Sequence, residues 1–263
     1  MGERLAYIRH SPQRVLDAGC GTGRDFALLR ARYAKAALIG CDFSIRTLAR
    51  ARAPRSLATR VRALWDGTTS AALVAADLTR LPLASACIGL IWSNLALPWS
   101  VDPAATFAEW HRVLEIGGLV MFTTYGPDTL KELRAGFARP AHVHGFIDMH
   151  DLGDQLIQAG FAEPVMDMEV LTLEYTELDG LMRDLRASGQ SNVLAERKRG
   201  LLGRGEWRAM RQRYESMRAA NGKLPATIEI VYGHAWKPAP RRRADGRDIV
   251  EFDLNRGRRG GSK

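Results

Sequence analysis

Three glycines at alternate positions follow a short apolar run near the start of the chain, in the segment RVLDAGCGTG at 14–23. The residues at 24–33 that come next have a helical pattern. This order predicts a strand, a tight loop and a helix. Glycine is needed in such a loop where the backbone adopts positive φ or comes close to a ligand, and the helix start offers unpaired N–H groups and the positive end of a dipole. The loop is therefore expected to bind a nucleotide-like ligand.

The spacing of the glycines and the acid before them limit the class of ligand that the loop can bind. A dinucleotide loop reads G-x-G-x-x-G and presents a helix start to a pyrophosphate, whereas this chain has G-x-G-x-G after Asp17. A carboxylate there repels phosphate but can hold an ammonium, such as that of the amino-acid part of S-adenosylmethionine. A second apolar run at 38–41 ends in Asp42, about twenty residues after the glycines, where a ribose-binding carboxylate is expected.

Together these features resemble the signature of class I methyltransferases. The alternative is a glycine turn in an ordinary α/β domain, in which case the two acids would be coincidental. The resemblance implies a Rossmann-like seven-stranded α/β sheet with helices on both faces and S-adenosylmethionine as cofactor. Its contacts are expected at Asp17, Gly19, Gly21, Gly23, Asp42 and Phe43, and at the later positions Asp77, Leu78 and Asn94.

Five further apolar runs complete the predicted sheet. The run at 72–76 is closed by Asp77, and the run at 87–94 ends in polar residues. Ligands bind outside the carboxyl ends of strands in open α/β sheets, so Asp77 is expected beside the adenine and Asn94 beside the reacting methyl group. The alternative for Asp77 is a turn cap. Other strands are predicted at 119–125, 165–175 and 227–234, and helices at 45–52, 103–114 (ended by Gly117-Gly118) and 151–159.

The last two predicted strands are separated by about fifty residues rather than by a hairpin turn. Thr176 with Asp179 predicts a capping box before an amphipathic helix, and a second helix carries Trp207, Met210 and Tyr214 on one side. We expect the segment 176–225 to form a helical lid over the substrate. The alternative is a solvent-exposed helical insertion without a role in catalysis.

Size and composition indicate one domain, at 1–238. Cys20, Cys41 and Cys87 are odd in number and widely spaced, which favours reduced thiols and provides no metal site. The first ten residues do not resemble a signal peptide, and no apolar run approaches the length of a membrane span. We therefore expect a cytoplasmic protein without metal or membrane contact.

The net charge of +9 and the pI near 9.9 indicate an acidic partner. Arginine is concentrated late in the chain, within 183–218 and 241–263. Charge alone does not choose between nucleic acid, an anionic membrane and an acidic protein. Residues 239–263 are rich in Arg and Gly and are expected to form a disordered, basic tail. An RNA-binding function ranks last, because the chain has no surface motif studded with aromatic residues.

Four later segments narrow the resemblance to one family. SNLALPW at 93–99, FTTYGPDTLKEL at 122–133, FIDMHD at 146–151 and VYGHAW at 231–236 resemble malonyl-acyl-carrier-protein O-methyltransferases of biotin synthesis. The similarity runs over about 14–238. It departs from the family at Pro98, where Gln is more usual, and in the short segment before the first strand. The resemblance implies transfer of a methyl group to the free carboxylate of a malonyl thioester on acyl carrier protein.

This chemistry requires no general base, since a carboxylate with a pKa near 4 is already ionised at pH 7. Catalysis then rests on alignment and on exclusion of water, and no catalytic acid or base is assigned. With Asn94, the substrate site is expected at Trp99 and Tyr125, with Arg183 or Arg186 near the malonyl group. The alternative for the two arginines is an exposed helix face. The basic insertion also suits an acidic carrier protein.

Two rival functions remain open on the sequence. A methyltransferase acting on another acid, a quinone or a different metabolite would keep the fold and the cofactor but change the purpose of the insertion. A protein related to respiratory-complex assembly factors would share the core and use it for hydroxylation or assembly.

Overall fold

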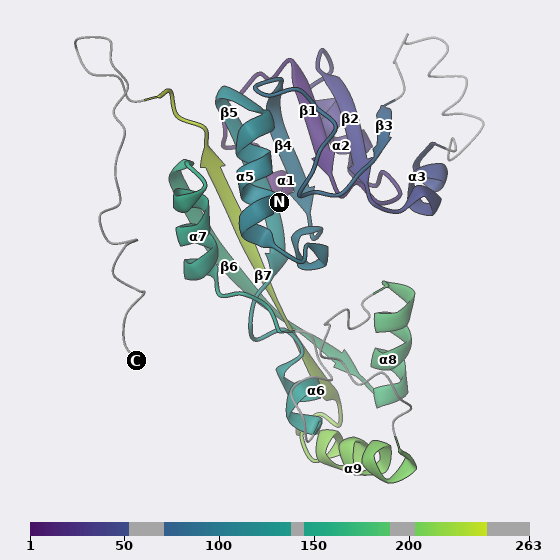
Figure 1. Cartoon of the computed structure of the whole chain (residues 1–263). Helices are drawn as coiled ribbons and strands as arrows, with labels where there is room; N and C mark the ends of the chain where they lie inside the picture. Colours follow the sequence, from purple (N-terminus) through teal and green to yellow (C-terminus); the bar gives the residue numbers. More distant parts are fainter. Residues whose placement is uncertain (53–70, 138–144, 190–202, 241–263) are drawn as a thin grey trace, which may run out of the picture.

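The computed structural model describes residues 1–52, 71–137, 145–189 and 203–240. Its centre is a seven-stranded sheet in the order β3-β2-β1-β4-β5-β7-β6 (Figure 1). Strands β1 to β5 are parallel where they pair, whereas β7 is antiparallel to both β5 and β6. The sheet predicted from the sequence is confirmed. The strands are β1 (Arg14–Ala18), β2 (Ala37–Asp42), β3 (Ala72–Ala75), β4 (Ile88–Asn94), β5 (Leu114–Tyr125), β6 (Ala162–Tyr175) and β7 (Leu224–Trp236).

Helices cover both faces of the sheet because neighbouring residues of its central strands point to opposite sides. Ile91 and Val120 pack under α5 (Pro103–Val113) and α7 (Met149–Gln158), in a core that includes Phe107, Trp110 and Leu156. Leu90 and Leu119 pack on the other face, against α1 (Gly2–Leu5) and α2 (Phe26–Arg32). The short helices α3 (Ile45–Arg52) and η1 (Leu97–Trp99) follow β2 and β4.

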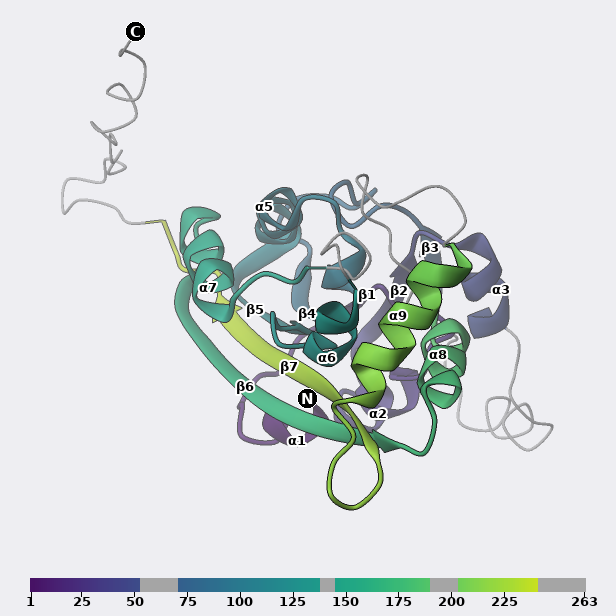
Figure 2. The same cartoon turned by 90° about the horizontal axis from the view of Figure 1, so that it is seen from below.

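Strands β6 and β7 extend well beyond the carboxyl ends of the parallel strands and carry a helical lobe (Figures 1 and 2). The lobe contains α8 (Leu178–Ala187) and α9 (Arg204–Glu215), which lie between the two strands in sequence, and also α6 (Lys131–Gly136). It has its own core of Leu133, Leu178, Leu181, Met210, Tyr214, Leu224 and Ala226. The predicted helical insertion between the last two strands is confirmed, and the lobe faces the edge of the sheet at which the parallel strands end (Figure 1).

Two local predictions are wrong. The pair Gly117-Gly118 does not end the helix predicted at 103–114: α5 ends at Val113, because Leu114 pairs with Ile88 as the first residue of β5, and Gly117 with φ 77° accommodates an irregularity inside the strand. The capping box is also absent: α8 follows Glu177, and no side chain caps it. The hydroxyl of Thr176 accepts a hydrogen bond from Lys223, and Asp179 pairs with Arg211.

The ends of several elements differ by a few residues from their predicted bounds. Strands β6 and β7 are both longer than expected, since they pair in register over almost their whole length. In the described part of the chain, every helix is too short or too polar to cross a bilayer. The expected tail beyond Pro240 lies outside the described residues.

Candidate active site

The three glycines of the loop after β1 all adopt positive φ, between 52° and 80°, but they serve different purposes. A side chain at Gly19 would place its Cβ only 2.1 Å from the Cβ of Ala96, and one at Gly23 would meet the ring of Phe26 at 2.6 Å. At Gly21 a Cβ would meet nothing within 4 Å. Gly19 and Gly23 therefore allow close packing of the protein, while Gly21 leaves open backbone at which a ligand can lie.

Asp17 is a buried carboxylate directly beneath this loop. It is 2% exposed, and its Oδ2 atom has no hydrogen-bond partner among the described residues. Burial raises its pKa to about 8, with further repulsion from Asp25 and Asp42. A buried carboxylate without a partner is destabilising. Asp17 is therefore suited to a ligand that brings a positive charge or a strong hydrogen-bond donor.

Asp42, at the end of β2, ties the glycine loop to α3. One carboxylate oxygen accepts from the N–H of Gly21 at 2.9 Å, and the other accepts from the N–H of Ser44 at 2.8 Å and from the Thr47 hydroxyl at 2.9 Å. Two apolar side chains beside it, Phe43 and Ile45, are 80% and 73% exposed. Exposed apolar groups next to an acid at a strand end can stack on a ligand base while the acid faces a hydroxyl.

Asp77, just after β3, is engaged in a turn. Its Oδ1 accepts from the N–H and the hydroxyl of Thr79, both at 2.8 Å, and these bonds lower the pKa of the carboxyl. Leu78 packs its side chain against the main core, so its backbone is the part available to a ligand. The turn considered as an alternative at Asp77 is present.

Asn94, at the end of β4, belongs to a network that fixes its orientation. Its Nδ2 donates to Asp25 at 3.0 Å, and its Oδ1 accepts from the Thr123 hydroxyl at 2.7 Å. The same Asp25 oxygen accepts from the indole N–H of Trp92 at 2.7 Å. The pairing of Asn94 with Thr123 across β4 and β5 places both at the same edge of the sheet as the glycine loop.

Asp25 is a site residue that the sequence reasoning missed. It immediately precedes α2, so Asp17, Asp25 and Asp42 form a group of three acids around one loop. The available signal was an acid two residues after the third glycine, at a helix start, where negative charge is favoured.

Trp99 and Tyr125 lie on the segments that leave β4 and β5. Trp99 is 42% exposed on η1, which follows a residue, Leu95, with φ 54°. Tyr125 packs its ring against Phe146 at 5.3 Å between centroids, and burial raises its pKa, so that its phenol is neutral at pH 7. Tyr125 ends β5, and η1 with Trp99 follows the end of β4, so both residues lie toward the carboxyl ends of the parallel strands.

Arg183 and Arg186 are exposed on α8, whose Leu178 and Leu181 fill the core of the lobe. The lobe therefore leaves both arginines exposed to solvent. Their assignment to the substrate stays a prediction.

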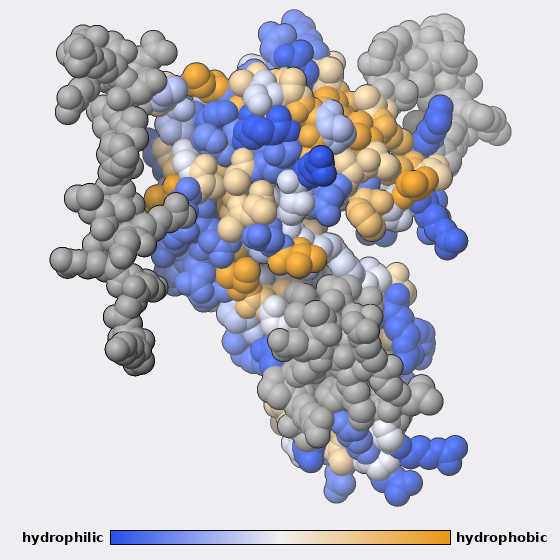
Figure 3. Space-filling model, viewed as in Figure 1, coloured by the Kyte–Doolittle hydropathy of each residue, from blue (hydrophilic) through white to orange (hydrophobic). Residues whose placement is uncertain are grey.

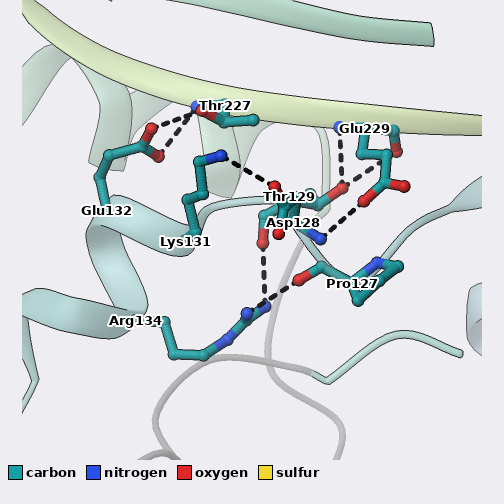
Figure 4. Close-up of polar contacts among 8 residues, drawn as sticks. All are labelled: Pro127, Asp128, Thr129, Lys131, Glu132, Arg134, Thr227 and Glu229. Carbon is teal, nitrogen blue, oxygen red and sulfur yellow. Dashed lines mark hydrogen bonds and ion pairs between the residues drawn. The ribbon is translucent and has the colours of Figure 1, made fainter. Parts of the chain in front are cut away.

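The loop between β5 and α6 is tied tightly to β7, as Figure 4 shows. Glu229 is 6% exposed, and its carboxylate accepts from the N–H of Asp128 at 2.7 Å. The Thr129 hydroxyl lies 3.0 Å from both the N–H and the carbonyl oxygen of Glu229. A side chain at Gly126 would place its Cβ 2.3 Å from the Glu229 carboxyl carbon. The exit from β5 is therefore fixed directly after Tyr125.

Two charged residues of α6 extend these ties into the lobe. Glu132 accepts from both the N–H and the hydroxyl of Thr227 on β7. Arg134 donates to the carbonyl oxygens of Pro127 and Thr129 at 2.8 and 3.0 Å. Buried Glu229 and this junction were not identified from the sequence, although an acid within the apolar run of β7 was a visible signal. Across the described ranges, no group of His, Cys, Asp and Glu side chains is arranged to hold a metal ion.

Comparison with known proteins identifies the family of the chain. A family model described as a methyltransferase domain matches residues 16–122, from β1 to β5. A malonyl-acyl-carrier-protein O-methyltransferase of Laribacter hongkongensis is 52% identical over 258 residues, which cover 96% of this chain and 86% of the relative. A protein of the same name from Gallionella capsiferriformans is 48% identical, over 95% of this chain and 86% of its own length. The chain belongs to the family of malonyl-acyl-carrier-protein O-methyltransferases.

The family assignment confirms the resemblance derived from the four later segments. The fold is also found in a solved structure, the YcgJ protein of Bacillus subtilis, with a TM-score of 0.60. That structure covers 90% of this chain and 96% of its own, at 14% identity. At such identity the likeness concerns the fold alone, and the substrate has to be argued from the site and from the family.

Proposed function

We propose that this protein transfers a methyl group from S-adenosylmethionine to the free carboxylate of a malonyl group carried on acyl carrier protein, in the cytoplasmic synthesis of biotin. Membership of the malonyl-acyl-carrier-protein O-methyltransferases supports the reaction. Within the site, the observation that carries the proposal is the buried, unpartnered carboxylate of Asp17 below the open backbone of Gly21.

The residues around the glycine loop fit the cofactor. Asp17 would hold its ammonium, directly or through water, and Gly21 would allow close approach, with Gly19 and Gly23 shaping the loop. Asp42 would face the ribose hydroxyls and Phe43 the adenine, whose edge would meet Asp77 and the backbone of Leu78. Asn94, fixed by Asp25 and Thr123, would border the reacting group. When bound, the cofactor supplies an electrophilic methyl group on a sulfonium.

The remaining task of the protein is alignment. A malonyl carboxylate is ionised at pH 7 and attacks without losing a proton, so the site has no need of a base. Trp99 and Tyr125 would exclude water and orient the acceptor, and the neutral phenol of Tyr125 does not repel it. Arg183 or Arg186 would attract the carboxylate. A single contact is preferable here, because a bidentate arginine would reduce the nucleophilicity of both oxygens.

The helical lobe would act as the lid of this site. Within a methyltransferase domain at 1–238, the described helices of the segment 176–225, α8 and α9, stand opposite the carboxyl ends of the parallel strands (Figure 1). Closure of this space would remove water from the reacting groups.

Mass spectrometry of the carrier protein tests the proposal. Purified protein with S-adenosylmethionine and malonyl-acyl carrier protein should add the mass of one methyl group to the malonyl carrier. Holo carrier without the malonyl group is the control and should stay unchanged. Bound cofactor without a mass shift on the malonyl carrier would refute the substrate and would favour another methyl acceptor or an assembly role.

Calorimetry tests the cofactor site separately. Asp42→Ala should weaken S-adenosylmethionine binding at least about tenfold, since the carboxylate both orders Gly21 and faces the ribose. Lys35→Ala, at the opposite end of the sheet, is the matched control and should bind normally. Unchanged affinity in Asp42→Ala would show that the glycine-loop site has been misassigned.

A further inference from the structure

We infer that the carrier protein docks on two separate helices at once, α3 of the sheet domain and α8 of the lobe, through exposed arginines on both sides of the substrate opening. This inference rests on the proposed function and adds to it the surface that recognises the carrier. The partner is a small acidic protein with its acyl group on a flexible thioester arm.

Helix α3 presents cations and no acids. Its sequence IRTLARAR contains no Asp or Glu, and Leu48 is its buried residue. Arg46 and Arg50 are exposed and lie one turn apart, on the side of the helix opposite Leu48. The helix start is anchored to the cofactor loop, because Asp42 accepts from Ser44 and Thr47. A protein bound to α3 would therefore be held in a fixed position relative to the donor site.

Helix α8 carries a second pair of exposed arginines, and each of its two acids has a partner of its own. Asp179 pairs with Arg211 of α9, and Asp184 accepts from the hydroxyl of Tyr175. Arg183 and Arg186 are exposed. Where the structure describes both partners, none of Arg46, Arg50, Arg183 and Arg186 takes part in an ion pair.

The two helices lie on the same side of the molecule. Figures 1 and 2 agree that α8 stands opposite α3, across the space between the sheet and the lobe. The space-filling view shows hydrophilic groups on both bodies at this side, beside hydrophobic patches on the sheet domain, with an indentation between the two bodies (Figure 3). One acidic surface can therefore contact both helices while its arm extends between them toward Asn94 and Tyr125.

Charge complementarity favours an acidic protein as the occupant. Arginines on both sides of an opening attract an acidic partner and raise its association rate, and this attraction weakens with salt. A nucleic acid would be drawn by the same charges, but an opening that leads to a methyl-transfer site suits a partner that delivers an acyl arm. Exposed Ile45, the first residue of α3, adds apolar contact area next to the charges.

Charge reversal on α3 is the decisive test, because α3 is not part of the lobe. Arg46→Glu with Arg50→Glu should lower kcat/KM for malonyl-acyl carrier protein about tenfold at low salt and should weaken binding of holo carrier. The loss should shrink as salt rises. Methylation of a small malonyl-pantetheine thioester should stay unchanged, which also shows that the variant is folded.

Two further variants complete the design. Arg183→Glu with Arg186→Glu should slow turnover of the carrier-bound substrate more than that of the small thioester. Arg9→Glu with Lys35→Glu makes the same charge change at the opposite end of the sheet and should leave both substrates unaffected.

The outcomes separate docking from function. Normal carrier turnover in the α3 variant, an equal loss on both substrates, or an equal loss in the Arg9 and Lys35 control would overturn the docking surface. Release of a bound oligonucleotide by the α3 variant, with carrier binding intact, would overturn it in favour of nucleic acid. Absence of methylation of any malonyl thioester by the unaltered protein would refute the proposed function instead, while binding of holo carrier would still report on docking.

Discussion

Replacement of Asp17 by asparagine should remove a pH dependence of stability that this carboxyl imposes on the ligand-free protein. The structure raises the pKa of Asp17 from 3.8 to about 8. The folded protein therefore keeps this proton over a pH range in which the unfolded chain has lost it. For a carboxyl with a raised folded pKa, the associated stability is complete below about pH 4 and is lost as pH rises toward 8.

The size of this stability change follows from the shift in the pKa of Asp17. Each pH unit in which only the folded state holds the proton changes the free energy of unfolding by about 1.4 kcal/mol. The proton is half lost at the folded pKa of about 8. The free energy of unfolding of the unaltered protein should therefore fall by about 2 kcal/mol between pH 6 and 8, relative to that of Asp17→Asn. Asparagine has the same shape as the protonated carboxyl without its titration, so it is the matched comparison.

Urea denaturation of both proteins at pH 6, 7 and 8, without cofactor, measures this difference. The pH dependence of cofactor binding is a second measurement. Affinity should rise with pH while stability falls, because a cationic ligand favours the ionised carboxyl. Affinity for S-adenosylmethionine should rise about tenfold from pH 6 to 7 in the unaltered protein, a range below the usual titration of an α-amino group. It should stay flat in Asp17→Asn. Parallel stability curves for the two proteins would refute the reasoning that Asp17 is a protonated, unpartnered acid.

Three glycine substitutions should have different effects. Gly19→Ala should lower the free energy of unfolding by more than about 2 kcal/mol, because it combines positive φ with the contact to Ala96. Gly21→Ala should cost only about 1 kcal/mol yet weaken cofactor binding in calorimetry, since its methyl group points into open space; the reverse order of stabilities would contradict this. Gly126→Ala should lower kcat more than cofactor affinity by displacing Glu229. Its destabilisation, about 1–3 kcal/mol, should be smaller in a Glu229→Ala background, and strict additivity would count against a clash.

The features that the sequence predicted best are those set by a few adjacent residues. The glycine loop, Asp17 and Asp42 are each determined by a short strand followed by a turn, and the sheet brings them together at one edge. The amphipathic helix expected after Thr176 is likewise present as α8, with Leu178 and Leu181 buried.

The features that it missed depend on partners distant in the chain. Asp25 becomes part of the site through Trp92 and Asn94, about seventy residues away. Glu229 meets Asp128 across about a hundred residues, and no local pattern marks that pair. Thr176 fitted a capping box in sequence but bonds to Lys223 on the opposite side of the insertion. The pairing of distant residues in the folded chain therefore decided these positions.

The tie between Glu229 and the loop after β5 makes the molecule mechanically continuous. Tyr125 is separated from α6 by five residues, and that short connection is bonded to the same strand, β7, that runs on into the lobe. A force applied to the lobe is thus transmitted along β7 to the backbone beside the methyl acceptor. Binding of a partner to the lobe and the backbone position of Tyr125 are consequently coupled through β7.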